Sequence, residues 1–234
     1  MSEPDLTIRR GERADLPAVA ELYLAVRQAA VPHMPPLAHD DDHVRAWVDG
    51  WDLRQREVWL AVHGGRLVGF ADLGPRWLNS LYVDPAAQRS SVGSALLDVV
   101  KSRLDGGFAL WVFESNAPAR AFYQRHGLVE LERTDGWGNE ERSPDIKMAW
   151  PGADAVGFFR RMIDEVDDQL ADLLARRVAL TRAVQPHKTS PRRDADRERR
   201  IAERMARTAP ELGATRIGRI MDVVITESLE AAGH

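Results

Sequence analysis

The 234-residue chain contains no cysteine. This absence excludes disulfide bonds, thiolate metal ligands and catalysis by a cysteine nucleophile. No apolar run approaches the roughly 18 residues that a membrane-spanning helix requires, and the N-terminal segment lacks the apolar core of a secretion signal. We therefore expect a soluble, cytoplasmic protein that does not interact with membranes.

Tryptophan and tyrosine are absent from the last 84 residues, because all seven Trp and all three Tyr lie at or before Trp150. The net charge is −5 for residues 1–150 (17 basic, 22 acidic) and +1 for residues 151–234 (15 basic, 14 acidic). Neither value favours nucleic-acid binding. The change in composition, with Pro151-Gly152 at the junction, predicts two domains covering residues 1–150 and 151–234.

The N-terminal part alternates strand-like and helix-like patterns, which predicts an α/β domain. The expected strands are Leu6–Arg9, Val58–Val62, Arg66–Leu73, Trp77–Val83, Phe108–Phe113, Leu128–Arg133 and Asp145–Trp150. The expected helices are Asp15–Ala29, Asp41–Val48, Ser91–Leu104 and Pro118–His126.

Two segments of this part carry chemistry. Residues 78–100 join a strand to an amphipathic helix through a turn of small residues, and a helix N-terminus exposes unpaired N–H groups that bind phosphate. Residues 112–130 place Asn116 after a strand and Tyr123 on the helix that follows. Either segment alone is a weak signal.

Together these segments resemble the GNAT superfamily of acyl-CoA-dependent acetyltransferases, over about residues 6–150. The resemblance implies a mixed sheet with helices on both faces, acetyl-CoA as co-substrate and an unidentified amine as acceptor. It also implies that Tyr123 protonates the leaving thiolate. The residues expected to contact CoA are Leu81, Val83, Gln88, Arg89, Ser91, Val92, Gly93, Ser94 and Asn116.

The sequence departs from the family pattern at the phosphate-binding turn and the acceptor site. Ser91 replaces a glycine at a position whose backbone conformation glycine adopts at low cost. Trp77 and Asn79 occupy the region where the family often has a glutamate base, and His39 is a candidate for the acceptor pocket. His39 and His43 have the spacing of metal ligands, but the acidic residues between them favour a helix start, and we expect no metal.

The C-terminal part carries a charged pattern on a long predicted helix. Arg177 and Lys188 are 11 residues apart, so a continuous helix directs both to one side. A second helix beginning near Asp194 would bring Arg197 and Glu198 to the same place. This makes a cationic pocket with one carboxylate, suited to a small dianion that carries a hydroxyl group. The apolar stripe of the long helix comprises Phe159, Ile163, Val166, Leu170, Leu173, Leu174, Ala179 and Val184.

Arg160 cannot join this pocket within one chain. It precedes Lys188 by 28 residues, about 42 Å along a helix. A partner chain packed antiparallel could supply it, which predicts a homodimer with sites built from two chains. Pro186 predicts that the long helix ends near Val184, with Lys188 on the following loop.

The ordered set of these residues resembles the all-helical AroQ-type chorismate mutases, over about residues 155–234. The resemblance implies a three-helix, all-α domain in an intertwined dimer that converts chorismate to prephenate without a cofactor, within shikimate-derived aromatic metabolism. The matching residues are Arg160, Ile163, Asp164, Asp167, Leu170, Leu173, Leu174, Arg177, Lys188, Asp194, Arg197, Glu198, Ile225, Glu227 and Ser228.

This rearrangement requires no nucleophile or acid–base pair, because positioning and electrostatic stabilisation suffice. The resemblance implies that Lys188 faces the ether oxygen, and that Arg177 and the partner subunit's Arg160 clamp the carboxylates. Glu198 would accept a hydrogen bond from the ring hydroxyl. The expected remainder of the substrate-binding lining is Asp194, Arg197 and Ser228.

Several alternatives remain open from the sequence. Ala232 stands where many family members carry Gln or Glu beside the ether oxygen, which leaves room for pyruvate elimination from isochorismate or rearrangement of 4-amino-4-deoxychorismate. The N-terminal domain could be a non-catalytic binding or regulatory module. The C-terminal helices could serve dimerisation alone.

Overall fold

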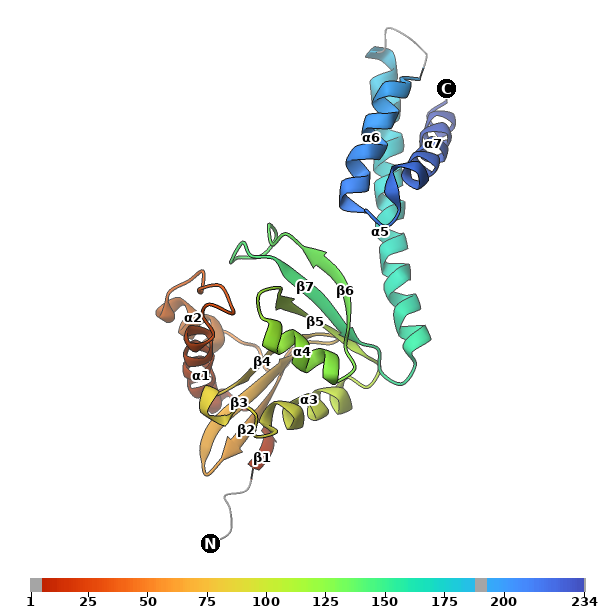
Figure 1. The fold of residues 1–234 in the computed structure, drawn as a ribbon. Coiled ribbons are helices and arrows are strands. Elements are labelled where there is room, and N and C mark those ends of the chain that lie inside the picture. Colours follow the sequence, from red (N-terminus) through yellow and green to blue (C-terminus); the bar gives the residue numbers. More distant parts are fainter. Residues whose placement is uncertain (1–5, 188–192, 234) are drawn as a thin grey trace. The chain divides into compact units, whose positions relative to one another are not determined.

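The computed structural model of the protein describes residues 6–187 and 193–233, in two compact units that divide between Phe159 and Arg160 (Figure 1). Helix α5 (Ala155–Val184) runs across this division. Within the described ranges, no helix combines the length and apolar character needed to cross a bilayer. The expected domain boundary after Trp150 stays a prediction.

The N-terminal unit is built on a mixed sheet in two parts. β1, β2, β3 and β4 pair antiparallel in chain order, while β7 lies between β5 and β6. A parallel bridge between Trp77 and Ala109 joins the two parts. The strands are β1 (Leu6–Arg10), β2 (Glu57–His63), β3 (Arg66–Leu73), β4 (Leu78–Val83), β5 (Phe108–Phe113), β6 (Val129–Thr134) and β7 (Asp145–Trp150).

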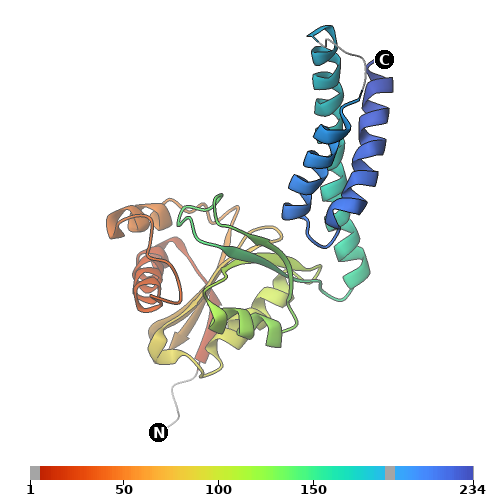
Figure 2. The ribbon, with the colours of Figure 1, turned by 45° about the horizontal axis from the view of Figure 1, so that its top comes forward.

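Helices cover both faces of this sheet (Figures 1 and 2), as the sequence predicts. Successive residues of a strand point to opposite faces. Accordingly Phe70 of β3 packs in one apolar cluster with Leu16 and Val48, and its neighbour Ala71 packs in another with Leu96. The helices are α1 (Leu16–Ala29), α2 (Asp41–Asp49), α3 (Val92–Arg103) and α4 (Ala117–Arg125).

Asp72 of β3 carries a buried carboxyl group. Its Oδ2 accepts a hydrogen bond of 2.8 Å from Arg56 Nη1. Burial raises the pKa of Asp72 to about 6, against a smaller opposing effect of Arg56. Because the folded state holds this proton more tightly than the unfolded state, the group stabilises the fold most at low pH. That contribution is lost as the pH rises through about 6.

We therefore expect a pH-dependent difference between the wild type and Asp72→Asn. The free energy of unfolding of the wild type, minus that of the variant, should fall by about 2 kcal/mol between pH 4 and pH 7. Urea denaturation across this pH range measures it. Asp49→Asn, at an exposed ion pair with Arg13, is the control and should show little change. A difference for Asp72→Asn that does not vary with pH would contradict the expectation.

The described part of the C-terminal unit is helical, with α5 followed by α6 (Ala195–Thr208) and α7 (Gly213–Ala231). α5 ends at Val184, as Pro186 predicts. α6 begins after Asp194, whose Oδ1 accepts a hydrogen bond of 2.9 Å from the backbone N–H of Arg197, which satisfies a donor of the first turn.

The apolar stripe of α5 faces solvent in the single chain. Ile163, Leu170 and Leu173 are 57%, 50% and 61% exposed, and Val166 is similarly exposed. Soluble proteins rarely leave such a contiguous apolar surface without a partner. The stripe is therefore a candidate interface.

Candidate active sites

A cleft of about 1480 Å³ lies between β4 and β5, beyond the bridge that joins Trp77 to Ala109. β4 is the edge strand of one part of the sheet and β5 of the other, so their facing sides line the cleft. The predicted CoA contacts and Tyr123 gather here. The cleft lining includes Leu81, Val83, Gln88, Arg89, Ser91, Gly93, Ser94, Asn116 and Tyr123.

The turn between β4 and α3 forms one wall of this cleft. Arg89 and Ser91 both have a left-handed backbone, with φ of 62° and 66°, and α3 starts directly after Ser91. Gln88 Nε2 donates to the carbonyl oxygen of Val83 at 3.3 Å. Val92, another predicted contact, has its side chain buried in the core, so it can face a ligand through its backbone alone. A helix N-terminus with an adjacent arginine can bind phosphate groups.

Ser91 adopts a left-handed conformation that glycine adopts more readily. The replacement of the family's glycine by Ser91 therefore has a conformational cost. A left-handed conformation costs a residue with a side chain about 1–2 kcal/mol, and a β-branched side chain is the least suited to it. We expect Ser91→Val to weaken acetyl-CoA binding about tenfold or more and Ser91→Gly to retain or improve it, as measured by calorimetry. Ser102→Val, on an exposed position of α3, is the control. Unchanged affinity of Ser91→Val would contradict this account.

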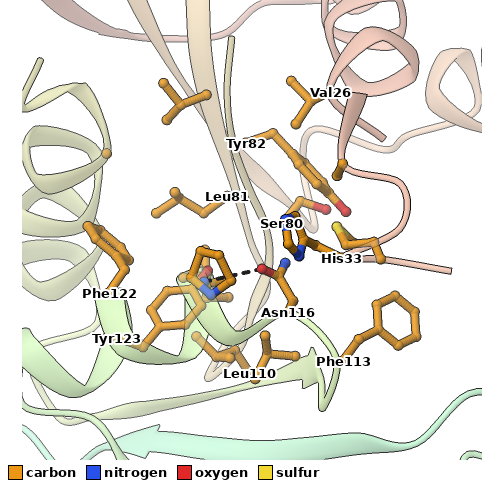
Figure 3. A pocket seen from close by; sticks show the side chains of 18 of the residues that line it. Val26, His33, Ser80, Leu81, Tyr82, Leu110, Phe113, Asn116, Phe122 and Tyr123 are labelled. Atoms are coloured by element: carbon orange, nitrogen blue, oxygen red, sulfur yellow. Dashed lines mark hydrogen bonds between the residues drawn. The ribbon is translucent and has the colours of Figure 1, made fainter. Parts of the chain in front are cut away.

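The opposite wall comes from α4. Asn116 caps this helix, its Oδ1 accepting a hydrogen bond of 3.2 Å from the backbone N–H of Ala119. Tyr123 is buried, and burial raises its pKa, so the phenol keeps its proton at neutral pH. Figure 3 shows Phe122 and Tyr123 on one side of the cleft and His33 and Ser80 on the other. A protonated phenol thus lies beside the cleft.

The far side of the cleft contains residues that sequence reasoning did not select. His33, Tyr82 and Arg27 line it, and the buried Arg27 pairs with Glu141 at 2.7 Å. His33 lies in a proline-rich stretch without a helical or strand period, so no local signal distinguishes it.

His39, the histidine selected from the sequence, lies elsewhere in the unit. Its ring stacks on His43 at 4.1 Å, and its Nε2 lies 3.4 Å from Glu140. Asp40 caps α2 through a hydrogen bond of 2.8 Å from the backbone N–H of His43. The acidic segment is thus a helix start, as predicted, and His33 lines the cleft whereas His39 and His43 do not.

In the C-terminal unit, Arg177 and Ser228 meet at one carbonyl group. Arg177 Nη1 donates to the carbonyl oxygen of Val224 at 3.1 Å, and Ser228 Oγ donates to the same oxygen at 2.5 Å. Burial, and secondarily the nearby charge of Arg197, lower the pKa of Arg177. The charges of Arg177 on α5 and Arg197 on α6 therefore act unfavourably on each other, and an anion bound beside both would offset this repulsion.

Glu198 of α6 is held by a residue that the sequence analysis passed over. Arg193 donates to both carboxylate oxygens of Glu198, at 2.8 and 2.7 Å, and to Asp222 of α7 at 2.7 Å. Arg193 lies in a run in which arginines alternate with acidic residues, a pattern that is typical of a solvated helix face.

Two predicted residues are not part of this group. Arg160 is exposed at the start of the unit, 17 residues before Arg177 and so roughly 25 Å away along α5. Lys188 lies outside the described residues. Ala232, the departure from the family pattern, follows the last residue of α7.

Comparison with known proteins finds two families in this chain. The model of the acetyltransferase (GNAT) family matches residues 19–128, and that of chorismate mutase type II matches residues 159–232. The peptidyl-lysine N-acetyltransferase YiaC of Escherichia coli is 30% identical over 145 residues, which cover 62% of this chain and 96% of that protein. A probable N-acetyltransferase of Mycobacterium tuberculosis is 27% identical, over 58% of this chain and 87% of the relative.

Solved structures show the same N-terminal fold. Apo YjaB of Escherichia coli superposes with a TM-score of 0.53 at 22% identity, over 64% of this chain and 99% of that one. The chain thus belongs to the GNAT acetyltransferase family and carries, fused to that domain, a chorismate mutase type II domain.

Proposed function

We propose that the protein is a bifunctional enzyme: the C-terminal unit rearranges chorismate to prephenate, and the N-terminal unit transfers an acetyl group from acetyl-CoA to an amine. The observation that carries the first activity is the interaction of like charges between Arg177 of α5 and Arg197 of α6, the residue directly before Glu198. A dicarboxylate with a hydroxyl group complements this arrangement of charges.

The mutase residues act by binding and orientation. Arg177, already fixed to Val224, can hold a substrate carboxylate through its remaining N–H groups. Glu198 is a hydrogen-bond acceptor for the ring hydroxyl, and Lys188 is assigned to the ether oxygen, where negative charge builds in the transition state. Confining the substrate in its reactive shape supplies the rest of the acceleration.

We further propose a homodimer formed through the apolar stripe of α5. The uncovered side chains of Ile163, Leu170 and Leu173 support it, and so does the distance of Arg160 from Arg177. In an antiparallel pair, the partner subunit's Arg160 would reach the second carboxylate. Each of the two sites would then be incomplete without the other chain.

For acetyl transfer, the cleft between β4 and β5 is the proposed site. The N-terminus of α3 and Arg89 suit the CoA phosphates. The bound thioester supplies the acetyl carbon that the amine attacks. Tyr123 donates its proton to the departing sulfur and recovers one from the attacking nitrogen, so the phenol is unchanged over the cycle. A peptidyl amine is one acceptor class, since the relative YiaC is a peptidyl-lysine acetyltransferase.

Loss of the ultraviolet absorbance of chorismate tests the mutase directly. Isochorismate and 4-amino-4-deoxychorismate, assayed separately, test the alternatives that Ala232 leaves open. Turnover of chorismate well above both supports the proposal, whereas no turnover of chorismate removes it. The assay is repeated with acetyl-CoA to detect communication between the activities.

Calorimetry with acetyl-CoA tests the acetyltransferase against the alternative of a non-catalytic module. Binding followed by acetylation of a lysine-containing peptide supports catalysis. Binding without acetylation of peptide or small amines favours a regulatory module, and no binding at millimolar acetyl-CoA removes the proposed co-substrate.

A further inference from the structure

Arg193 connects three segments of the C-terminal unit. It precedes α6, and its guanidinium forms a two-bond fork with Glu198, with Nε and Nη2 at 2.8 and 2.7 Å from the carboxylate oxygens. On α7, Nη2 also donates to Asp222 Oδ1 at 2.7 Å, and Nη1 donates to Thr226 Oγ1 at 3.2 Å. One side chain thus holds a carboxylate of α6 against two polar residues of α7.

The fork fixes more than a point charge could. A planar guanidinium that makes two parallel hydrogen bonds sets the plane of the carboxylate as well as its position. The two bonds use two of the roughly four acceptor positions of the Glu198 carboxylate, so the others remain able to accept a bond from a ligand. The Glu198 side chain is 28% exposed, which leaves this edge within reach of solvent.

We infer that Arg193 is a positioning residue of the mutase site: it holds the Glu198 carboxylate between α6 and α7 as an oriented acceptor for the substrate hydroxyl. This inference rests on the proposed chorismate mutase activity. It makes the site select substrates that offer a hydrogen-bond donor at that position.

The charges around Glu198 give this role a signature in pH. Hydrogen bonding to Arg193 is the largest cause that lowers the pKa of Glu198, while Asp222 and Asp194 act in the opposite direction. Without Arg193 the carboxylate loses this hydrogen bond and keeps the opposing influence of burial and of these two acidic groups. The pKa of Glu198 then rises, and Glu198 loses its role as an ionised acceptor at a higher pH than in the wild type.

The test compares kcat and KM for chorismate between pH 4 and pH 9 in Arg193→Met, Arg193→Lys and a control. The control is Arg199→Met, which removes the same charge from α6 at an exposed pair with Asp196. For Arg193→Met we expect kcat/KM at pH 7.5 to fall by about tenfold to a hundredfold, as for loss of charge-assisted hydrogen bonds, and its acidic limb to move to higher pH. Arg193→Lys should keep the acidic limb near that of the wild type, because the charge remains.

If Arg193→Met has the pH profile and kcat/KM of Arg199→Met, the inference is overturned. If Arg193→Met unfolds, the test rests on Arg193→Lys. This variant loses the two-bond fork, so its kcat/KM should fall severalfold, while the acidic limb of its pH profile should stay where it is in the wild type. A lysine variant indistinguishable from the wild type would overturn the orienting role. An active wild type with unaffected variants removes this inference alone, whereas an inactive wild type removes the proposed function as well.

Discussion

Arg177→Ala should lower kcat/KM for chorismate by about 10²- to 10³-fold, the size of effect that follows loss of one preorganised donor in an active site. The guanidinium of Arg177 is half-buried and already tied to Val224, so little reorganisation is needed when a substrate carboxylate arrives. Removing it eliminates one half of the cationic pair and leaves Arg197 alone. The ultraviolet assay measures the loss directly.

Arg176→Ala is the matched control for this variant. Arg176 precedes Arg177, is exposed and points about 100° away around the helix. We expect it to retain wild-type turnover. Light scattering should show the same oligomeric state for both variants, which separates a catalytic defect from loss of assembly. An Arg177→Ala enzyme within a few fold of the wild type would remove Arg177 from the site.

Leu170→Arg should dissociate the proposed dimer and abolish chorismate turnover together. Each chain would lose about 2 kcal/mol of apolar burial and would have to bury a charge without a partner, which costs several kcal/mol more. We expect the dissociation constant to rise more than about a thousandfold. Without a partner chain, Arg160 cannot reach the pocket of Arg177.

Asp168→Arg introduces the same side chain on the opposite face of α5, about 160° from Leu170, at an exposed position. It should remain dimeric and active. Both variants should bind acetyl-CoA as the wild type does, because the cleft of the N-terminal unit is intact. A Leu170→Arg chain that stays monomeric yet turns over chorismate would contradict the shared site. Sedimentation velocity measures the assembly.

Most elements could be predicted because their signals are local. The hairpin of β2 and β3 follows from alternating apolar residues around Gly64-Gly65, both of which have positive φ. The expected strand from Trp77 is wrong by one residue, since β4 begins at Leu78. The register of β3 and β4 shifts between Asp72 and Leu73, and Trp77 bridges to Ala109 of β5 instead. Such a bulge depends on pairing, which the period of one strand does not encode.

The sites were predictable where a motif is contiguous and unpredictable where it is assembled by folding. The turn from Gln88 to Gly93 is one segment, so its place beside the cleft follows from the resemblance. Arg193 is held in place by hydrogen bonds to Asp222 and Thr226, which lie about thirty residues later on another helix. His33 enters the cleft from an irregular stretch after α1. In both cases the sequence shows the residue but not its neighbours.

Gly107 has a positive φ of 98°, and any methyl group there would sit 2.4 Å from the ring of Phe158, which is buried near the start of α5. The ring of Phe158 thus occupies the space that a side chain at position 107 would need. The change in composition after Trp150 would by itself assign Phe158 to the C-terminal domain. Anyone who excises the acetyltransferase for crystallography, or grafts it onto a new fusion partner, must carry the chain past Phe158. A shorter fragment would expose the apolar surface that Phe158 covers, and such a surface promotes aggregation.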